Sequence, residues 1–150
     1  ADTVTLESVK GGTGTVSGGK EGEDKVVETL PVLPPLEVGK IILGFQPGST
    51  GLTLEADRLL VEFVELLLQY PNARILVKGF VSSNNDTLEN MQLSVERAKS
   101  IEQLLIARGI GKAQIEVRGM GIKDPIATND TRAGRLKNRR AEIEVIDDGV

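Results

Sequence analysis

Between Gly39 and Val145 the chain alternates between the two-residue period of a β-strand and the longer period of an amphipathic helix. This alternation restricts the fold to helices packed against a sheet, because each kind of element must bury its apolar face against another layer. Strands are predicted at residues 40–45, 74–81, 115–120 and 141–146, and helices are predicted to begin near Thr53 and Thr87. The order predicts an α+β fold, a two-layer sandwich of helices on a mixed four-stranded sheet.

Capping residues mark the predicted helix boundaries. Pro71 ends the first helix, whose apolar stripe is Ala56, Leu59, Leu60, Phe63 and Leu67. Asp86 and Glu89 have the spacing of a capping box, so we expect Asp86 to cap the second helix. Gly109 stands where helices often end in the left-handed conformation, with Ile110 placed for the accompanying contact. The predicted core face of the second helix is Leu93, Ala98, Ile101, Leu104 and Leu105.

The first quarter of the chain differs in composition from the rest. Residues 1–38 are rich in Gly, Ser, Glu and Lys and end in a proline cluster, which predicts a flexible or partly extended linker. A domain is expected over residues 39–147 and a short tail over 148–150. Residues 3–9 could instead form an edge strand. No apolar run reaches the ~20 residues that span a bilayer, and we expect any targeting segment to lie outside this chain.

The composition excludes many kinds of chemistry. Cysteine and histidine are absent, which removes disulfides, thiol catalysis, histidine-based triads and the common zinc sites. The net charge of −4 gives no electrostatic reason to expect nucleic acid, and aromatic residues make up only 3% of the chain. We therefore expect no metal, no cofactor and no enzymatic activity.

An ordered series of residues is similar to the signature of the OmpA-like, peptidoglycan-associated domain family. The series is Asn90, Leu93, Ser94, Arg97, Ala98, Gly119, Gly121, Pro125, Ile126, Ala127, Gly134, Asn138, Arg139 and Arg140. The resemblance covers about residues 41–145 and implies a βαβαββ domain that binds the diaminopimelate of peptidoglycan stem peptides. In that family an aspartate binds the ammonium group of diaminopimelate, and an arginine binds its carboxylate.

The chain departs from this family pattern at the loop before the second helix. The family's arginine falls on Arg97, but the position of the aspartate is occupied by Ser82, after Phe80 and Val81 in place of polar residues. Loss of one partner of a desolvated charge pair costs about 2–5 kcal/mol, so recognition of diaminopimelate is expected to be weakened or absent. Asp86 is an alternative source of the missing charge.

Six residues are candidates for contact with the stem peptide: Arg97, Ser82, Asn90, Val81, Asn138 and Arg139. Spacing alone leaves other roles open. Arg97 could form an internal salt bridge, Asn90 and Asn138 could fix loop carbonyls, and Arg139 could be a solvated charge at the start of a strand.

The predicted function is that of a non-catalytic cell-envelope module that anchors non-covalently to peptidoglycan. The expected location is the periplasm, with association to the outer membrane through a segment that is not in this chain. The alternative is a divergent structural or protein-interaction domain that has lost peptidoglycan binding and has another envelope protein as its partner.

Overall fold

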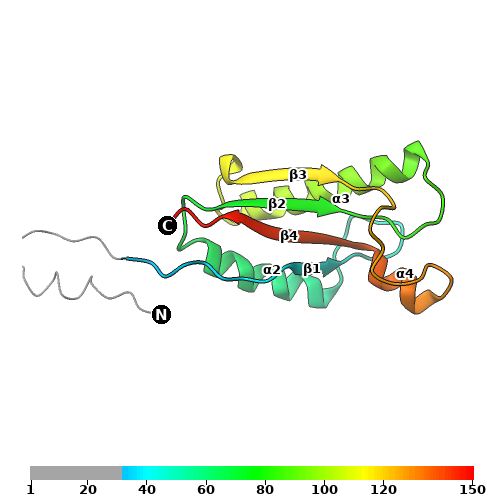
Figure 1. Ribbon diagram of the computed structural model, residues 1–150, viewed down its shortest axis with the longest axis horizontal. Helices are drawn as coiled ribbons and strands as arrows, with labels where there is room; N and C mark the ends of the chain where they lie inside the picture. Colours follow the sequence, from blue (N-terminus) through cyan, green and yellow to red (C-terminus); the bar gives the residue numbers. More distant parts are fainter. Residues whose placement is uncertain (1–31) are drawn as a thin grey trace, which may run out of the picture. The chain divides into compact units, whose positions relative to one another are not determined.

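The four strands of the computed structural model, which describes residues 32–150, form one mixed sheet in the order β1-β4-β2-β3 (Figure 1). The strands are β1 (Ile41–Gly44), β2 (Arg74–Gly79), β3 (Ile115–Gly119) and β4 (Arg140–Asp147). β4 pairs antiparallel with both of its neighbours, whereas β2 and β3 are parallel. The predicted mixed four-stranded sheet is confirmed.

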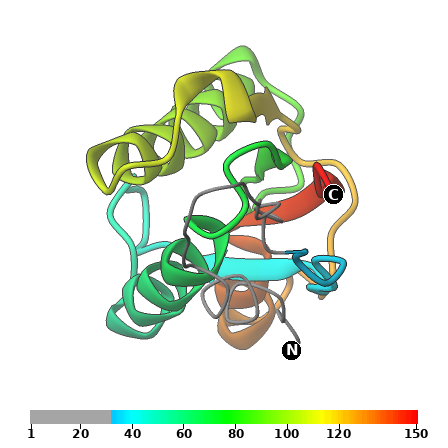
Figure 2. The ribbon, with the colours of Figure 1, turned by 90° about the vertical axis from the view of Figure 1, so that its left-hand side faces the viewer.

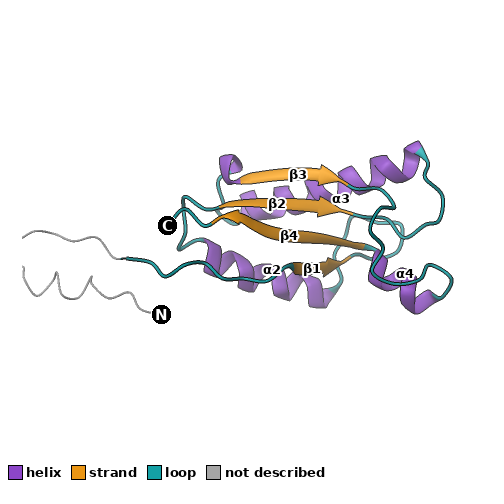
Figure 3. Ribbon diagram, viewed as in Figure 1, coloured by secondary structure: helices purple, strands orange, loops and turns teal. Residues whose placement is uncertain are grey.

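Two long helices cover one face of this sheet (Figures 2 and 3). α2 (Leu54–Leu67) packs against β1, and α3 (Leu88–Ala107) packs against β2 and β3. The layers are joined by fully buried side chains from both, among them Leu43, Leu60, Leu67, Ile75, Val77, Ile101, Leu105 and Ile143. Burial of such aliphatic side chains is the main force that holds a two-layer domain together.

The apolar core-facing residues predicted for the two long helices are largely correct. In α2 all of the predicted apolar residues are buried except Leu59, which is 40% exposed. In α3 the buried face is centred one position away from the prediction, so Leu93 and Leu104 are only half-buried. Ser94 and Arg97 are buried on that face instead, which gives α3 a polar segment inside the domain.

The cap of α3 differs from the prediction. Thr87, not Asp86, is the N-cap residue, and its hydroxyl accepts a hydrogen bond from the main-chain N–H of Asn90 (3.1 Å). The helix therefore begins one residue later than an Asp86 cap requires, and Asp86 is exposed. The predicted end is confirmed, because Gly109 has a φ of 106°. Ile110 donates its main-chain N–H to Leu105 (3.0 Å), which is a standard closure of a helix C-terminus.

Two glycines allow α3 to lie unusually close to the sheet. A Cβ atom at Gly79 would clash with the carbonyl oxygen of Ser94 on α3. A Cβ atom at Gly119 would clash with the side chain of Val95. The close approach brings the second turn of α3 to the ends of β2 and β3, and Arg97 follows Ser94 by almost one turn.

A third helix, α4 (Arg132–Asn138), was not predicted from the sequence. It lies at the end of the sheet where β2 and β3 finish (Figure 1). Thr131 caps it by accepting a hydrogen bond from the N–H of Gly134 (2.9 Å). The helix is short, and Leu136 at its centre is 50% exposed, so it has no apolar stripe that the sequence pattern could reveal.

Residues Leu36–Gly149 form one compact unit. The possible edge strand at residues 3–9 and most of the predicted linker lie outside the described residues. The boundary placed near residue 38 remains a prediction. None of the helices between residues 32 and 150 is both long and apolar enough to cross a membrane.

Candidate functional site

Arg97 is buried inside the domain, with 1% of its surface exposed. Its Nε donates a hydrogen bond to the carbonyl oxygen of Ser49 (3.0 Å), and its Nη1 donates to that of Phe80 (2.9 Å). The guanidinium carbon lies 5.1 Å from the centre of the Phe45 ring, which is the distance of a cation–π contact. The loop after β1, the end of β2 and the middle of α3 therefore meet at one side chain.

Arg97 has no ion-pair partner within residues 32–150. The internal salt bridge that the sequence allowed is not formed there, and carbonyl dipoles solvate the charge instead. Burial, and to a smaller extent the charge of Arg139, lowers the pKa of Arg97 to about 10. A buried cation that is held only by neutral groups is stabilised by any anion that reaches it.

The first three residues of the loop that follows β2, Phe80, Val81 and Ser82, carry no charge. Phe80 is buried, and the guanidinium of Arg140 stacks on its ring at 3.7 Å. Val81 is also buried and donates its main-chain N–H to the carbonyl of Gly121 (2.8 Å). Ser82 is half-buried, and its hydroxyl makes no hydrogen bond with another described residue. At position 82 the loop thus supplies an uncommitted hydroxyl, and its one carboxylate is that of Asp86, which is exposed.

Amide side chains fix the rest of the same loop. Asn129 donates its Nδ2 to the carbonyl oxygen of Ser83 (3.0 Å) and to the Oδ1 of Asn84 (3.2 Å). Asn90 donates its Nδ2 to the carbonyl oxygen of Asn85 (2.8 Å). The segment between β2 and α3 is therefore held from both sides, by α3 and by the chain before α4.

Asn138 is buried, and its side-chain amide makes four hydrogen bonds inside the domain. Its Oδ1 accepts from the main-chain N–H groups of Ile126 (2.7 Å) and Ala127 (3.0 Å). Its Nδ2 donates to the carbonyl of Ala127 (2.8 Å) and to the Oδ1 of Asn129 (2.7 Å). Asn138 fixes loop groups, one of the two roles that the sequence left open for it, and in this way positions Asn129.

Arg139 is half-buried at the C-terminal end of α4. Its Nε donates a hydrogen bond to the carbonyl oxygen of Phe45 (3.1 Å), the residue whose ring contacts Arg97. Burial lowers the pKa of Arg139, and so do the charges of Arg135 and Arg132. The site therefore contains several cations close enough to perturb one another.

The loop between β1 and α2 was not predicted to contribute to the site. It folds back on itself through a hydrogen bond from the N–H of Gln46 to the carbonyl of Gly51 (2.9 Å), and Gly48 adopts a positive φ of 58°. The resulting turn directs the carbonyl of Ser49 toward Arg97. Pro47 and Gly48 signalled a turn in the sequence, but nothing in the sequence indicated which side chain the turn would contact.

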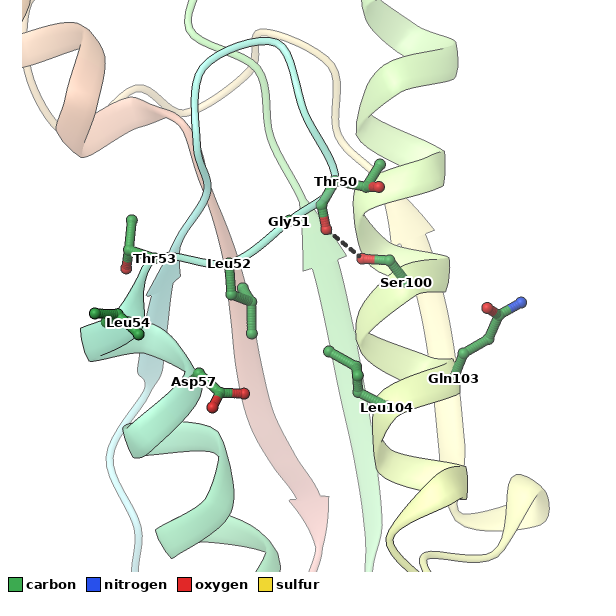
Figure 4. A pocket seen from close by; sticks show the side chains of 9 residues that line it. All are labelled: Thr50, Gly51, Leu52, Thr53, Leu54, Asp57, Ser100, Gln103 and Leu104. Carbon is green, nitrogen blue, oxygen red and sulfur yellow. Dashed lines mark hydrogen bonds between the residues drawn. The ribbon is translucent and has the colours of Figure 1, made fainter.

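A separate pocket of about 490 Å³ lies between the start of α2 and α3 (Figure 4). Its lining comprises Thr50, Gly51, Leu52, Thr53, Leu54, Asp57, Ser100, Gln103 and Leu104. Asp57 is its single carboxylate, so the pocket offers no pair of groups for acid–base chemistry. None of the six candidate residues lines it. Residues 32–150 also contain no group of three or more acidic side chains that could hold a metal ion.

Comparison with known proteins supports the sequence resemblance. The model of the OmpA family matches residues 44–139. A peptidoglycan-binding protein, ArfA of Mycobacterium tuberculosis, is 38% identical over 100 residues, which cover 65% of this chain and 31% of that protein. Outer membrane protein A of Bordetella avium is 40% identical over 102 residues, which cover 68% of this chain and 53% of that protein. The chain therefore spans between a quarter and three fifths of the length of the curated relatives that it matches, from 25% to 59%.

Solved structures share the fold. The peptidoglycan-associated lipoprotein of Burkholderia pseudomallei superposes with a TM-score of 0.64 and 26% sequence identity, covering 69% of this chain and 88% of that chain. It combines the same kind of sheet and helical layer with a sequence that differs at most positions.

Proposed function

The chain belongs to the OmpA family, and on that premise we propose that it is a non-catalytic cell-envelope module that binds peptidoglycan through a carboxylate of the stem peptide. The observation that carries the proposal is the buried guanidinium of Arg97, which has no counter-ion within the described residues. The relatives named above are peptidoglycan-binding or outer-membrane proteins, which supports a location in the cell envelope.

Arg97 is suited to a carboxylate ligand for a physical reason. The domain already holds this cation away from water, so an anion that enters the site gains a strong electrostatic interaction without a new desolvation cost for the guanidinium. The hydrogen bonds to Ser49 and Phe80 fix the plane of the guanidinium and leave other N–H donors for the ligand. A planar fork of donors binds a carboxylate with two parallel hydrogen bonds.

The uncharged residue at position 82 determines which carboxylate fits best. Ser82 cannot neutralise an ammonium group, so a ligand with a cation beside its carboxylate loses about 2–5 kcal/mol relative to a site with an aspartate. That loss corresponds to at least about tenfold in the dissociation constant. The module therefore prefers a carboxylate without a neighbouring ammonium and recognises diaminopimelate weakly.

Cosedimentation with purified sacculi tests this function. The native domain is expected to pellet with cell wall at micromolar concentration, and Arg97→Gln is expected to remain in the supernatant because the anion-binding charge is gone. Lys99→Gln is the matched control, since it removes an exposed cation from the same helix. If the native domain stays soluble, the alternative of a structural or protein-interaction domain replaces this proposal. Circular dichroism of each variant verifies that loss of binding is not loss of fold.

A further inference from the structure

Three guanidinium groups are held by main-chain carbonyl oxygens around the proposed site. Arg97 binds the carbonyls of Ser49 and Phe80, and Arg139 binds that of Phe45. Arg135 donates its Nη1 to the carbonyl of Asn129 (2.9 Å). Asn129 in turn holds the loop after β2 through Ser83 (3.0 Å), so Arg135 is anchored to the segment that borders the site.

Arg132 and Arg135 belong to α4, and Arg139 is the C-cap residue of this helix. Arg132, Arg135 and Arg139 are separated by three and four residues, the spacing of one helical face. Lys137 lies on a different face, where it lines a pocket with Ile42 and Leu59. The three arginines therefore lie on the same side of the helix and are not spread evenly around it.

None of these arginines has an acidic partner among residues 32–150. The cations that form ion pairs in this part of the chain are Lys40, Lys78, Lys112, Arg118 and Arg140. Acidic residues are abundant in this chain of net charge −4, but none of the described ones, Asp130 beside α4 included, forms an ion pair with these arginines. Burial is the largest cause of the lowered pKa of Arg139, and the charges of Arg135 and Arg132 lower it further. The charge of Arg139 likewise adds to the effect of burial on the pKa of Arg97. Such mutual repulsion is relieved by an anionic ligand.

We propose that the site binds a ligand with two separate anionic groups, one at Arg97 and the second at Arg139 and Arg135. The inference rests on the proposed function and adds a second anion subsite to it. The occupant is a dicarboxylate segment of the stem peptide whose carboxylates have no neighbouring ammonium groups. The second carboxylate accepts hydrogen bonds from those N–H groups of Arg139 and Arg135 that are not bonded to the carbonyls of Phe45 and Asn129.

Titration of the isotope-labelled full chain with small carboxylates, followed by NMR, measures the second subsite directly. Pimelate carries two carboxylates and no ammonium, and heptanoate has the same chain length with one carboxylate. Pimelate is expected to bind roughly fivefold more tightly than heptanoate, since a partly exposed ion pair contributes up to about 1 kcal/mol. Arg135→Gln is expected to remove most of that advantage without weakening heptanoate. Lys137→Gln is the matched control on the same helix and is expected to preserve the advantage.

The outcomes separate this inference from the proposed function. Equal affinity for pimelate and heptanoate, both lost in Arg97→Gln, would overturn the second subsite and leave carboxylate binding at Arg97 intact. An advantage for pimelate that Arg135→Gln does not change would also overturn it. Binding of inorganic phosphate as tight as that of pimelate, with the same dependence on both arginines, would show that one compact dianion fills the site. If neither carboxylate binds although the domain pellets with sacculi, the two-anion inference is wrong while association with peptidoglycan stands.

Discussion

At the scale of single residues, the proposed site combines a buried cation with an uncharged residue at position 82. Arg97 is buried without a carboxylate partner in the described part of the chain, and Ser82 carries a hydroxyl at the position that has an aspartate in the family pattern. Phe80 and Val81 are buried, so the start of the loop is held by apolar packing. The proposed site therefore has a positive charge at Arg97 and no carboxylate at position 82.

Restoring the acidic residue should restore recognition of the diamino acid. Ser82→Asp is expected to strengthen binding of diaminopimelate by at least about tenfold, because an ion pair with its ammonium group becomes available. Calorimetric titration of both proteins with diaminopimelate measures the change, and Ser83→Asp on the neighbouring residue is the control. No gain in affinity would mean that the packing of Phe80 and Val81 has changed the shape of the loop as well as its charge.

The close contact between α3 and the sheet also depends on one residue. Gly79→Ala is expected to lower the free energy of unfolding by about 2 kcal/mol or more, because the added methyl group would meet the backbone of α3 at Ser94. Gly39→Ala is the control, since a Cβ atom there has no neighbour within 4 Å. Urea denaturation of both variants measures the difference. Equal stability would show that α3 can move away from β2 without loss.

At the scale of elements, the start of α3 depends on Thr87 rather than on the acidic residue before it. Thr87→Ala is expected to destabilise the domain by about 1 kcal/mol through loss of the hydrogen bond to the N–H of Asn90. Asp86→Ala should change the stability by no more than about 0.5 kcal/mol, as for an ordinary surface residue. Thermal unfolding compares the two variants. A larger loss of stability in Asp86→Ala than in Thr87→Ala would show that Asp86 caps the helix.

The elements with strong periodicity could be predicted from the sequence, and the short ones could not. The strands and the two long helices follow the positions of their apolar residues, and Gly109 ends α3 as expected. α4 has only 7 residues, and its Leu136 is exposed. The capping residue Thr131 was therefore the one signal in the sequence that a helix begins there. Asp86 and Thr87 are both good capping residues, and the choice between them depends on the length of the loop after β2.

At the scale of the whole molecule, the site lies where distant segments converge at one end of the sheet. The sequence named Arg97 and Arg139 as candidates but could not show that Phe45 links them, with its ring on Arg97 and its carbonyl bound to Arg139. It did not single out Arg135, because a cation on a short polar helix looks like an ordinary solvated charge. These relations arise from tertiary contacts between residues far apart in the chain, which single-sequence periodicity does not record.

The most direct measurement of the central claim is the NMR response of the arginine side chains to a purified stem peptide. If Arg97 binds a carboxylate, its Nε–H signal shifts in a saturable manner, with the same apparent affinity as the main-chain signals of Ser82 and Phe80. The stem peptide with its carboxylates amidated is expected to cause no shift. Saturable binding of both peptides with an unchanged Arg97 signal would contradict the account, because peptidoglycan would then be recognised elsewhere on the domain.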